Sequence, residues 1–76
     1  MGGKGPRRLS EVAAIARKYE CTLEPPGTGR HWKFKKPGKP PYPVKAHNGY
    51  RSEIPWYYIQ GLCRQMDIPE AAFADD

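Results

Sequence analysis

Cysteine is scarce in this chain, and its placement argues against a metal site. The two cysteines, Cys21 and Cys63, stand far apart, and neither has a second cluster of ligand-type residues near it. A structural zinc site uses four ligands, usually in close pairs, so we expect no metal and no cofactor. Each cysteine lies in an apolar stretch, which favours a small buried side chain. A disulfide stays open as an alternative, although a reducing compartment disfavours it.

Long apolar runs are also missing. No run approaches the ~18 apolar residues of a membrane span, and no apolar segment follows the basic N-terminus as in a signal peptide. We therefore expect a soluble, cytoplasmic protein with no membrane partner. Its 76 residues give one domain. A chain this short buries only about 60% of its unfolded surface, so a large enclosed catalytic cavity is not expected.

Acidic residues are absent from the middle of the chain and basic residues from its end. Residues 1–66 hold all thirteen Lys and Arg against four acids, a net charge of +9, and residues 67–76 hold the other four acids. Between Glu24 and Glu53 there is no acid at all. The basic residues in that gap are Arg30, Lys33, Lys35, Lys36, Lys39, Lys45 and Arg51. This distribution predicts a polyanion partner, and a merely solvating basic surface is the alternative.

The hydrophobic pattern predicts two helices that flank three short strands. Apolar residues recur at helical spacing from Leu9 to Tyr19 with Ser10 as N-cap, and a second helix is expected from about Ser52 to Ile68. The strands are expected at 21–24, 30–36 and 42–46, with a flexible basic arm at 1–8 and a mobile acidic tail at 69–76. The fold class is therefore α+β: a two-layer α-β-β-β-α domain whose antiparallel three-stranded sheet carries both helices on one face.

Alternation within the strands divides the predicted sheet into a core face and an open face. Successive side chains of a strand point to opposite faces, so Trp32, Phe34 and Val44 share one face. If that face is the core, the open face collects the polar and basic residues of the two strands. Those residues are His31, Lys33, Lys35, Lys45 and His47.

Two segments of the chain combine glycine, histidine, aromatic and basic residues at short spacing. The first is Gly29-Arg30-His31-Trp32-Lys33-Phe34-Lys35-Lys36-Pro37-Gly38. The second is Val44-Lys45-Ala46-His47 together with Ile59-Gln60-Gly61-Leu62-Cys63-Arg64-Gln65-Met66-Asp67-Ile68. These segments resemble the HicA-type toxins, the small mRNA interferases of HicA–HicB toxin–antitoxin pairs, whose signature is Gly-Ser-His followed by an aromatic residue, a basic residue and Pro-Gly. The resemblance spans residues 9–68. Arg30 replaces the usual Ser, and Pro55-Trp56-Tyr57-Tyr58 replaces the usual Lys-Lys-Gly-Thr.

The resemblance implies a fold similar to a double-stranded-RNA-binding domain, metal-independent cleavage of mRNA and neutralisation by a HicB-like antitoxin. The catalytic role falls on His31, the histidine of the signature. His47 is a helper candidate, and the seven basic residues of the acid-free gap are the candidate RNA ligands. A non-catalytic RNA-binding module with the same basic face is the alternative, and a protein-interaction domain is a third. The 56–58 aromatic run exposes at least one ring, a candidate partner surface.

Overall fold

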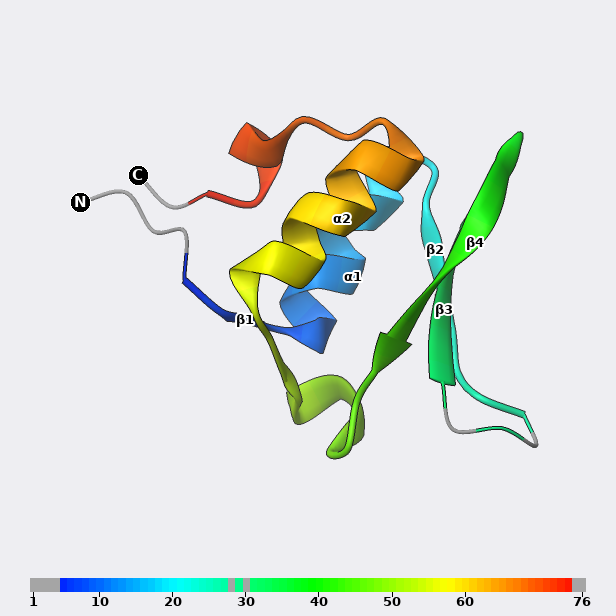
Figure 1. The fold of residues 1–76 in the computed structure, drawn as a ribbon, viewed down its shortest axis with the longest axis vertical. Coiled ribbons are helices and arrows are strands. Elements are labelled where there is room, and N and C mark those ends of the chain that lie inside the picture. The colour runs from blue at the N-terminus through cyan, green and yellow to red at the C-terminus, as the bar shows by residue number, and fades with distance from the viewer. Residues whose placement is uncertain (1–4, 28, 30, 75–76) are drawn as a thin grey trace.

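The computed structural model describes residues 5–27, 29 and 31–74. The elements are β1 (Arg7–Arg8), α1 (Leu9–Arg17), β2 (Thr22–Glu24), β3 (His31–Lys36), β4 (Lys39–Lys45), the 3-10 helix η1 (Gly49–Arg51), β5 (Glu53–Ile54), α2 (Trp56–Met66) and the 3-10 helix η2 (Glu70–Ala72). Strands β2, β3 and β4 form an antiparallel sheet in that order, and β1 pairs with β5. Both helices lie on the same side of the three-stranded sheet (Figure 1). The predicted α+β class is confirmed.

The register of the sheet confirms the predicted alternation. Trp32 pairs with Val44, and Phe34 lies between Leu23 of β2 and Tyr42 of β4. Phe34 and Val44 are buried in the core with the apolar stripe of α2, whereas His31, Lys33, Lys35 and Lys45 are exposed. The sheet therefore buries one face beneath the helices and turns its basic residues to the other face.

Both helix starts differ from the prediction. Helix α1 begins at Leu9, so Ser10 is an exposed residue of the first turn and not the N-cap. The Glu11 carboxylate accepts a hydrogen bond from the Arg8 backbone N–H at 3.2 Å instead. Helix α2 begins at Trp56 and not near Ser52. The Ser52 hydroxyl accepts a hydrogen bond from the Asn48 N–H at 2.8 Å, and Glu53 and Ile54 pair with β1 before the helix starts.

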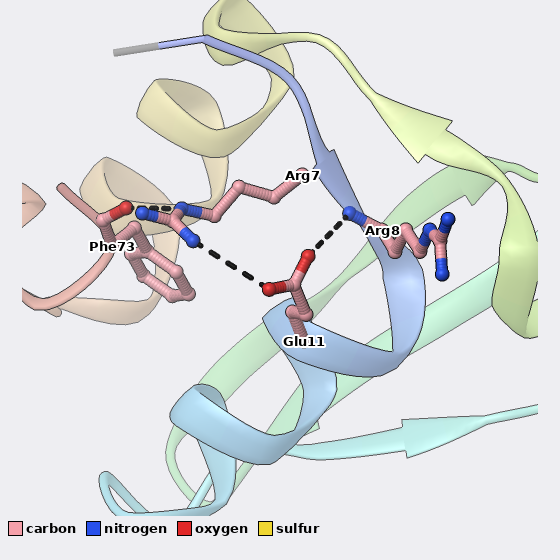
Figure 2. Close-up of polar contacts among 4 residues, drawn as sticks. All are labelled: Arg7, Arg8, Glu11 and Phe73. Atoms are coloured by element: carbon pink, nitrogen blue, oxygen red, sulfur yellow. Dashed lines mark hydrogen bonds and ion pairs between the residues drawn. The ribbon is translucent and has the colours of Figure 1, made fainter. Parts of the chain in front are cut away.

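The two ends of the described chain pack together, which corrects the expected arm and tail at residues 7–8 and 70–73, whereas residues 1–4 and 75–76 of these segments lie outside the described residues. Arg7 and Arg8, assigned by prediction to a flexible arm, form β1, and Phe73, assigned to a mobile tail, is 0% exposed. The Arg7 Nε donates a hydrogen bond to the Phe73 carbonyl oxygen, and its guanidinium forms an ion pair with Glu11 at 3.7 Å (Figure 2). Burying the Phe73 ring is strongly favourable. This gain holds the segment against the core, although the neighbouring residues are acidic or small.

A glycine allows α2 to approach β4 closely. The Tyr42 hydroxyl donates a hydrogen bond to the Tyr58 carbonyl oxygen at 2.9 Å, which brings the phenol ring over the helix at Gly61. A Cβ atom at position 61 would collide with the Tyr42 hydroxyl and would lie 3.1 Å from its Cζ. Gly61 is therefore required by the contact between the two layers and not by its backbone conformation.

We expect Gly61→Ala to destabilise the protein, although Gly→Ala in a helix normally stabilises by roughly 0.5–1 kcal/mol. Overpacking a close contact typically costs about 1–3 kcal/mol, so the free energy of unfolding should fall. Urea denaturation measures it. Adding Tyr42→Phe removes the nearest clashing atom. The free energy of unfolding of the double variant should therefore fall by less than the sum of the decreases of the two single variants. Strict additivity of the two losses would contradict this packing account.

Candidate nucleic-acid interface

The candidate site lies on the open face of the sheet, where β3 begins and β4 ends. His31 is the first residue of β3, and its Cα partner on β4 is Lys45. Two residues further along β3, on the same face of the sheet, Lys33 lies between Glu24 of β2 and Pro43 of β4. All of these residues are exposed to solvent. The pairing places an imidazole beside an ammonium group at a position that solvent and a large ligand can both reach.

His31 occupies the junction of three surface depressions. One is lined by His31, Lys45, Ala46 and His47, so the two histidines share a depression although His47 follows the end of β4 and is not part of the sheet. A second is lined by Pro25, Pro26 and Gly27 with Glu24, Gly29, His31 and Lys33. The third is lined by Tyr42, Pro43 and Tyr58 with His31 and Lys45. An extended ligand that crosses the start of β3 therefore passes His31 in any of these directions.

An acidic residue that the charge pattern did not single out lies on the basic face. Glu24, which opens the acid-free gap, forms an ion pair with Lys35, with Oε1 and Nζ 2.9 Å apart. Both side chains are about half exposed, so the pair contributes only ~0–1 kcal/mol to stability. Its larger effect is on the ligand, because it partly neutralises Lys35, whereas Lys33 and Lys45 form no ion pair with any residue that the structure describes.

Removing this carboxylate should strengthen the binding of a polyanion. We expect Glu24→Gln to raise the affinity for single-stranded RNA by about two- to fivefold at low salt, since it frees Lys35 and removes a repulsive charge. The gain should shrink as salt is added, because the groups are exposed and screened over ~8 Å at physiological ionic strength. Fluorescence anisotropy with a labelled oligonucleotide measures both effects. An unchanged or reduced affinity at low salt would show that the ligand does not lie over this pair.

Two of the other predicted RNA ligands, Lys36 and Lys39, lie away from His31. Lys36 projects to the helix side, where its Nζ donates a hydrogen bond to the Met66 carbonyl oxygen at 2.8 Å. That contact satisfies a carbonyl at the C-terminal end of α2 and suits the negative end of the helix dipole. Lys39 pairs with Lys36 at the far end of the sheet, roughly 17 Å along the strand from His31. Arg51 lies in η1 beyond β4, and Arg30 lies outside the described residues.

The cysteines take the predicted structural role. Cys21 and Cys63 are free thiols buried in the core. Burial raises the pKa of both thiols, that of Cys63 to about 11, so neither supplies a thiolate near neutral pH. Among the described residues, no group of three or more His, Cys, Asp and Glu side chains is placed to hold a metal ion. None of the helices in that part of the chain is long and apolar enough to cross a membrane.

The aromatic run at the start of α2 divides between core and surface. Trp56 and Tyr58 pack partly against the core, whereas Tyr57 is 68% exposed, as the prediction of at least one exposed ring requires. The Tyr57 and Tyr58 rings contact each other with centroids 5.0 Å apart. Sequence reasoning did not connect Tyr58 with His31, because their shared depression depends on how α2 crosses β4.

Comparisons with known proteins add no relative to this description. No protein-family model, curated protein or solved structure was found to match the chain. Functional inference therefore rests on the sequence motifs and on the chemistry that the open face gathers around His31.

Proposed function

We propose that the protein is a metal-independent endoribonuclease of the HicA type, which binds RNA on the open face of its sheet. The observation that supports the proposal most strongly is the grouping of His31, His47 and Lys45 around one exposed depression. Imidazoles suit proton transfer near neutral pH, and ammonium groups suit a phosphate. In metal-independent cleavage of RNA the ribose 2′-hydroxyl of the substrate can serve as the nucleophile, and a histidine can take its proton.

The proposed reaction is an internal transesterification. His31 takes the proton of the ribose 2′-hydroxyl, and the 2′-oxygen forms a new bond to the adjacent phosphorus. The bond from phosphorus to the 5′-oxygen breaks, and that oxygen receives a proton from a general acid, for which His47 is the candidate. Lys45 and Lys33 stabilise the negative charge that grows on the phosphate oxygens. The products are a 2′,3′-cyclic phosphate and a 5′-hydroxyl, so atoms and protons balance without a cofactor.

The resemblance to HicA-type toxins extends the proposal to partners and location. An active mRNA interferase arrests the growth of its own cell, so we propose a HicB-like antitoxin as its binding partner and the cytoplasm as its place of action. The same resemblance leads us to propose a fold similar to a double-stranded-RNA-binding domain, and the α+β arrangement with both helices on one side of the sheet is compatible with it. Growth arrest on expression, relieved by His31→Ala, is the outcome expected in cells.

A non-catalytic RNA-binding module is the second candidate, and one observation favours it. Across residues 5–27, 29 and 31–74, no hydrogen bond to the His31 ring is present, whereas catalytic histidines are commonly oriented by a partner. Such a module would use Lys33 and Lys45 for phosphate binding and His31 only as a further contact. Cleavage by the parent protein separates the two candidates.

RNA binding itself is tested by its dependence on salt. Each phosphate of single-stranded RNA that the protein neutralises contributes about −0.7 to the slope of log K against log salt. Lys33→Gln combined with Lys45→Gln removes two proposed contacts, so the slope should become less negative by about 1.4. Arg17→Gln combined with Lys18→Gln, at the end of α1, removes the same charge from the other side of the molecule and should change the slope little. Equal effects of the two double variants would contradict binding on the open face.

A further inference from the structure

Beside His31 lies a depression that combines aromatic and apolar residues with two basic ones. Tyr42, Pro43 and Tyr58 line it, and His31 and Lys45 close the side that faces the proposed cleavage position. His31 and Lys45 line both depressions, but the first adds Ala46 and His47 to them, whereas this one adds the flat carbon surfaces of two tyrosines and a proline. The two walls of the site therefore differ in the chemistry that they can bind.

Tyr58 is held in a fixed position relative to the site. The Tyr42 hydroxyl donates a hydrogen bond to the Tyr58 carbonyl oxygen at 2.9 Å, which holds the first turn of α2 against β4 at the residue that precedes Pro43. Tyr58 also packs partly against the core, and the exposed Tyr57 ring lies against it. Because its backbone and one ring face are already constrained, Tyr58 loses little conformational freedom when a ligand packs against the remaining surface.

We propose that Tyr58, with Tyr42 and Pro43, forms a nucleobase subsite next to the phosphate held at His31 and Lys45. The occupant is one unpaired base of single-stranded RNA, stacked on the aromatic wall. This inference rests on the proposed function and adds the form of the substrate to it. A base in a duplex is stacked and paired on its own strand, so it cannot enter the subsite without first leaving the helix. Single-stranded RNA is then the preferred ligand, and the base beside the cleaved bond contributes to affinity.

The test compares a short single-stranded oligonucleotide with one of equal length in which the bases are missing. Both carry 2′-O-methyl groups, so that neither is cleaved, and anisotropy gives their dissociation constants for the parent, Tyr58→Leu and Tyr58→Phe. Stacking a base on an aromatic ring contributes roughly 5- to 100-fold in affinity. We expect Tyr58→Leu to weaken binding of the base-containing strand by that factor and to leave the abasic strand unaffected. Tyr58→Phe keeps the ring and should restore most of the loss.

Tyr50→Leu is the matched control, because Tyr50 is an exposed tyrosine that lines a depression with α1 and β2 on another side of the molecule. It should bind both strands as the parent does. Equal affinity of the parent for the two strands overturns the subsite without any variant, and so does an equal loss of both strands in a folded Tyr58→Leu protein. In either case RNA binding itself stands. If the parent binds neither strand, the proposed function fails together with the subsite.

Discussion

His31→Ala should slow RNA cleavage by about 10²–10⁴-fold, the usual contribution of general acid–base catalysis by one side chain. His31 is exposed at the start of β3, so truncating its side chain creates no cavity. The free energy of unfolding should therefore stay within about 0.5 kcal/mol of that of the parent. Affinity for a non-cleavable strand should change much less than the rate, because the phosphate still meets Lys33 and Lys45. Single-turnover cleavage of a labelled RNA in EDTA measures the effect.

Two comparison variants sharpen that experiment. Lys45→Gln should lower the rate and the affinity together, since its ammonium meets the phosphate in the ground state as well as in the transition state. His47→Ala tests whether His47 is the general acid. If it is, the variant should lose a similarly large factor in cleavage rate with little change in affinity for RNA. A folded His31→Ala protein that cleaves as fast as the parent would refute the assignment.

Phe73→Ala should lower the free energy of unfolding by about 3–5 kcal/mol. The ring is 0% exposed and belongs to the same core cluster as Leu9 and Met66, so its truncation leaves a cavity between the two ends of the chain. Small domains have net stabilities of only about 5–15 kcal/mol, so the variant should be close to unfolding at 37 °C. Chemical denaturation monitored by circular dichroism gives the value.

The neighbouring residues provide the controls for that substitution. Phe73→Leu keeps an apolar side chain in the core and should lose clearly less than Phe73→Ala. Glu70→Gln lies in the same segment but is exposed, so its unfolding free energy should stay within about 0.5 kcal/mol of the parent. A Phe73→Ala protein as stable as the parent would mean that residues 70–73 are not docked in solution.

The sheet and its faces were predictable from sequence because both depend on local alternation. Strong apolar residues at every second position, such as Trp32 and Phe34, identify the buried face, and their neighbours His31 and Lys33 then have to lie on the other face. The same rule applied to β2 also places Glu24 on the open face, although its ion pair with Lys35 depends on a cross-strand contact that composition does not show.

The features that sequence did not predict depend on contacts between distant segments. Helix α2 begins at Trp56 and not near Ser52 as predicted. The reason is that Glu53 and Ile54 form a strand that pairs with β1, which lies some 46 residues earlier in the chain. Phe73 looked like part of a tail since acids and small residues surround it, and only its packing against the N-terminal segment reveals its role. The contact of Tyr58 with the site follows likewise from the crossing of α2 over β4.

The most direct test of the proposed function is an end-group determination on RNA incubated with the purified parent protein in EDTA. The account predicts new fragments that carry a 2′,3′-cyclic phosphate and a 5′-hydroxyl, and it predicts their loss with His31→Ala. Intact RNA in the parent reaction would favour the non-catalytic binding module, and fragments with 5′-phosphates would contradict attack by the ribose 2′-oxygen.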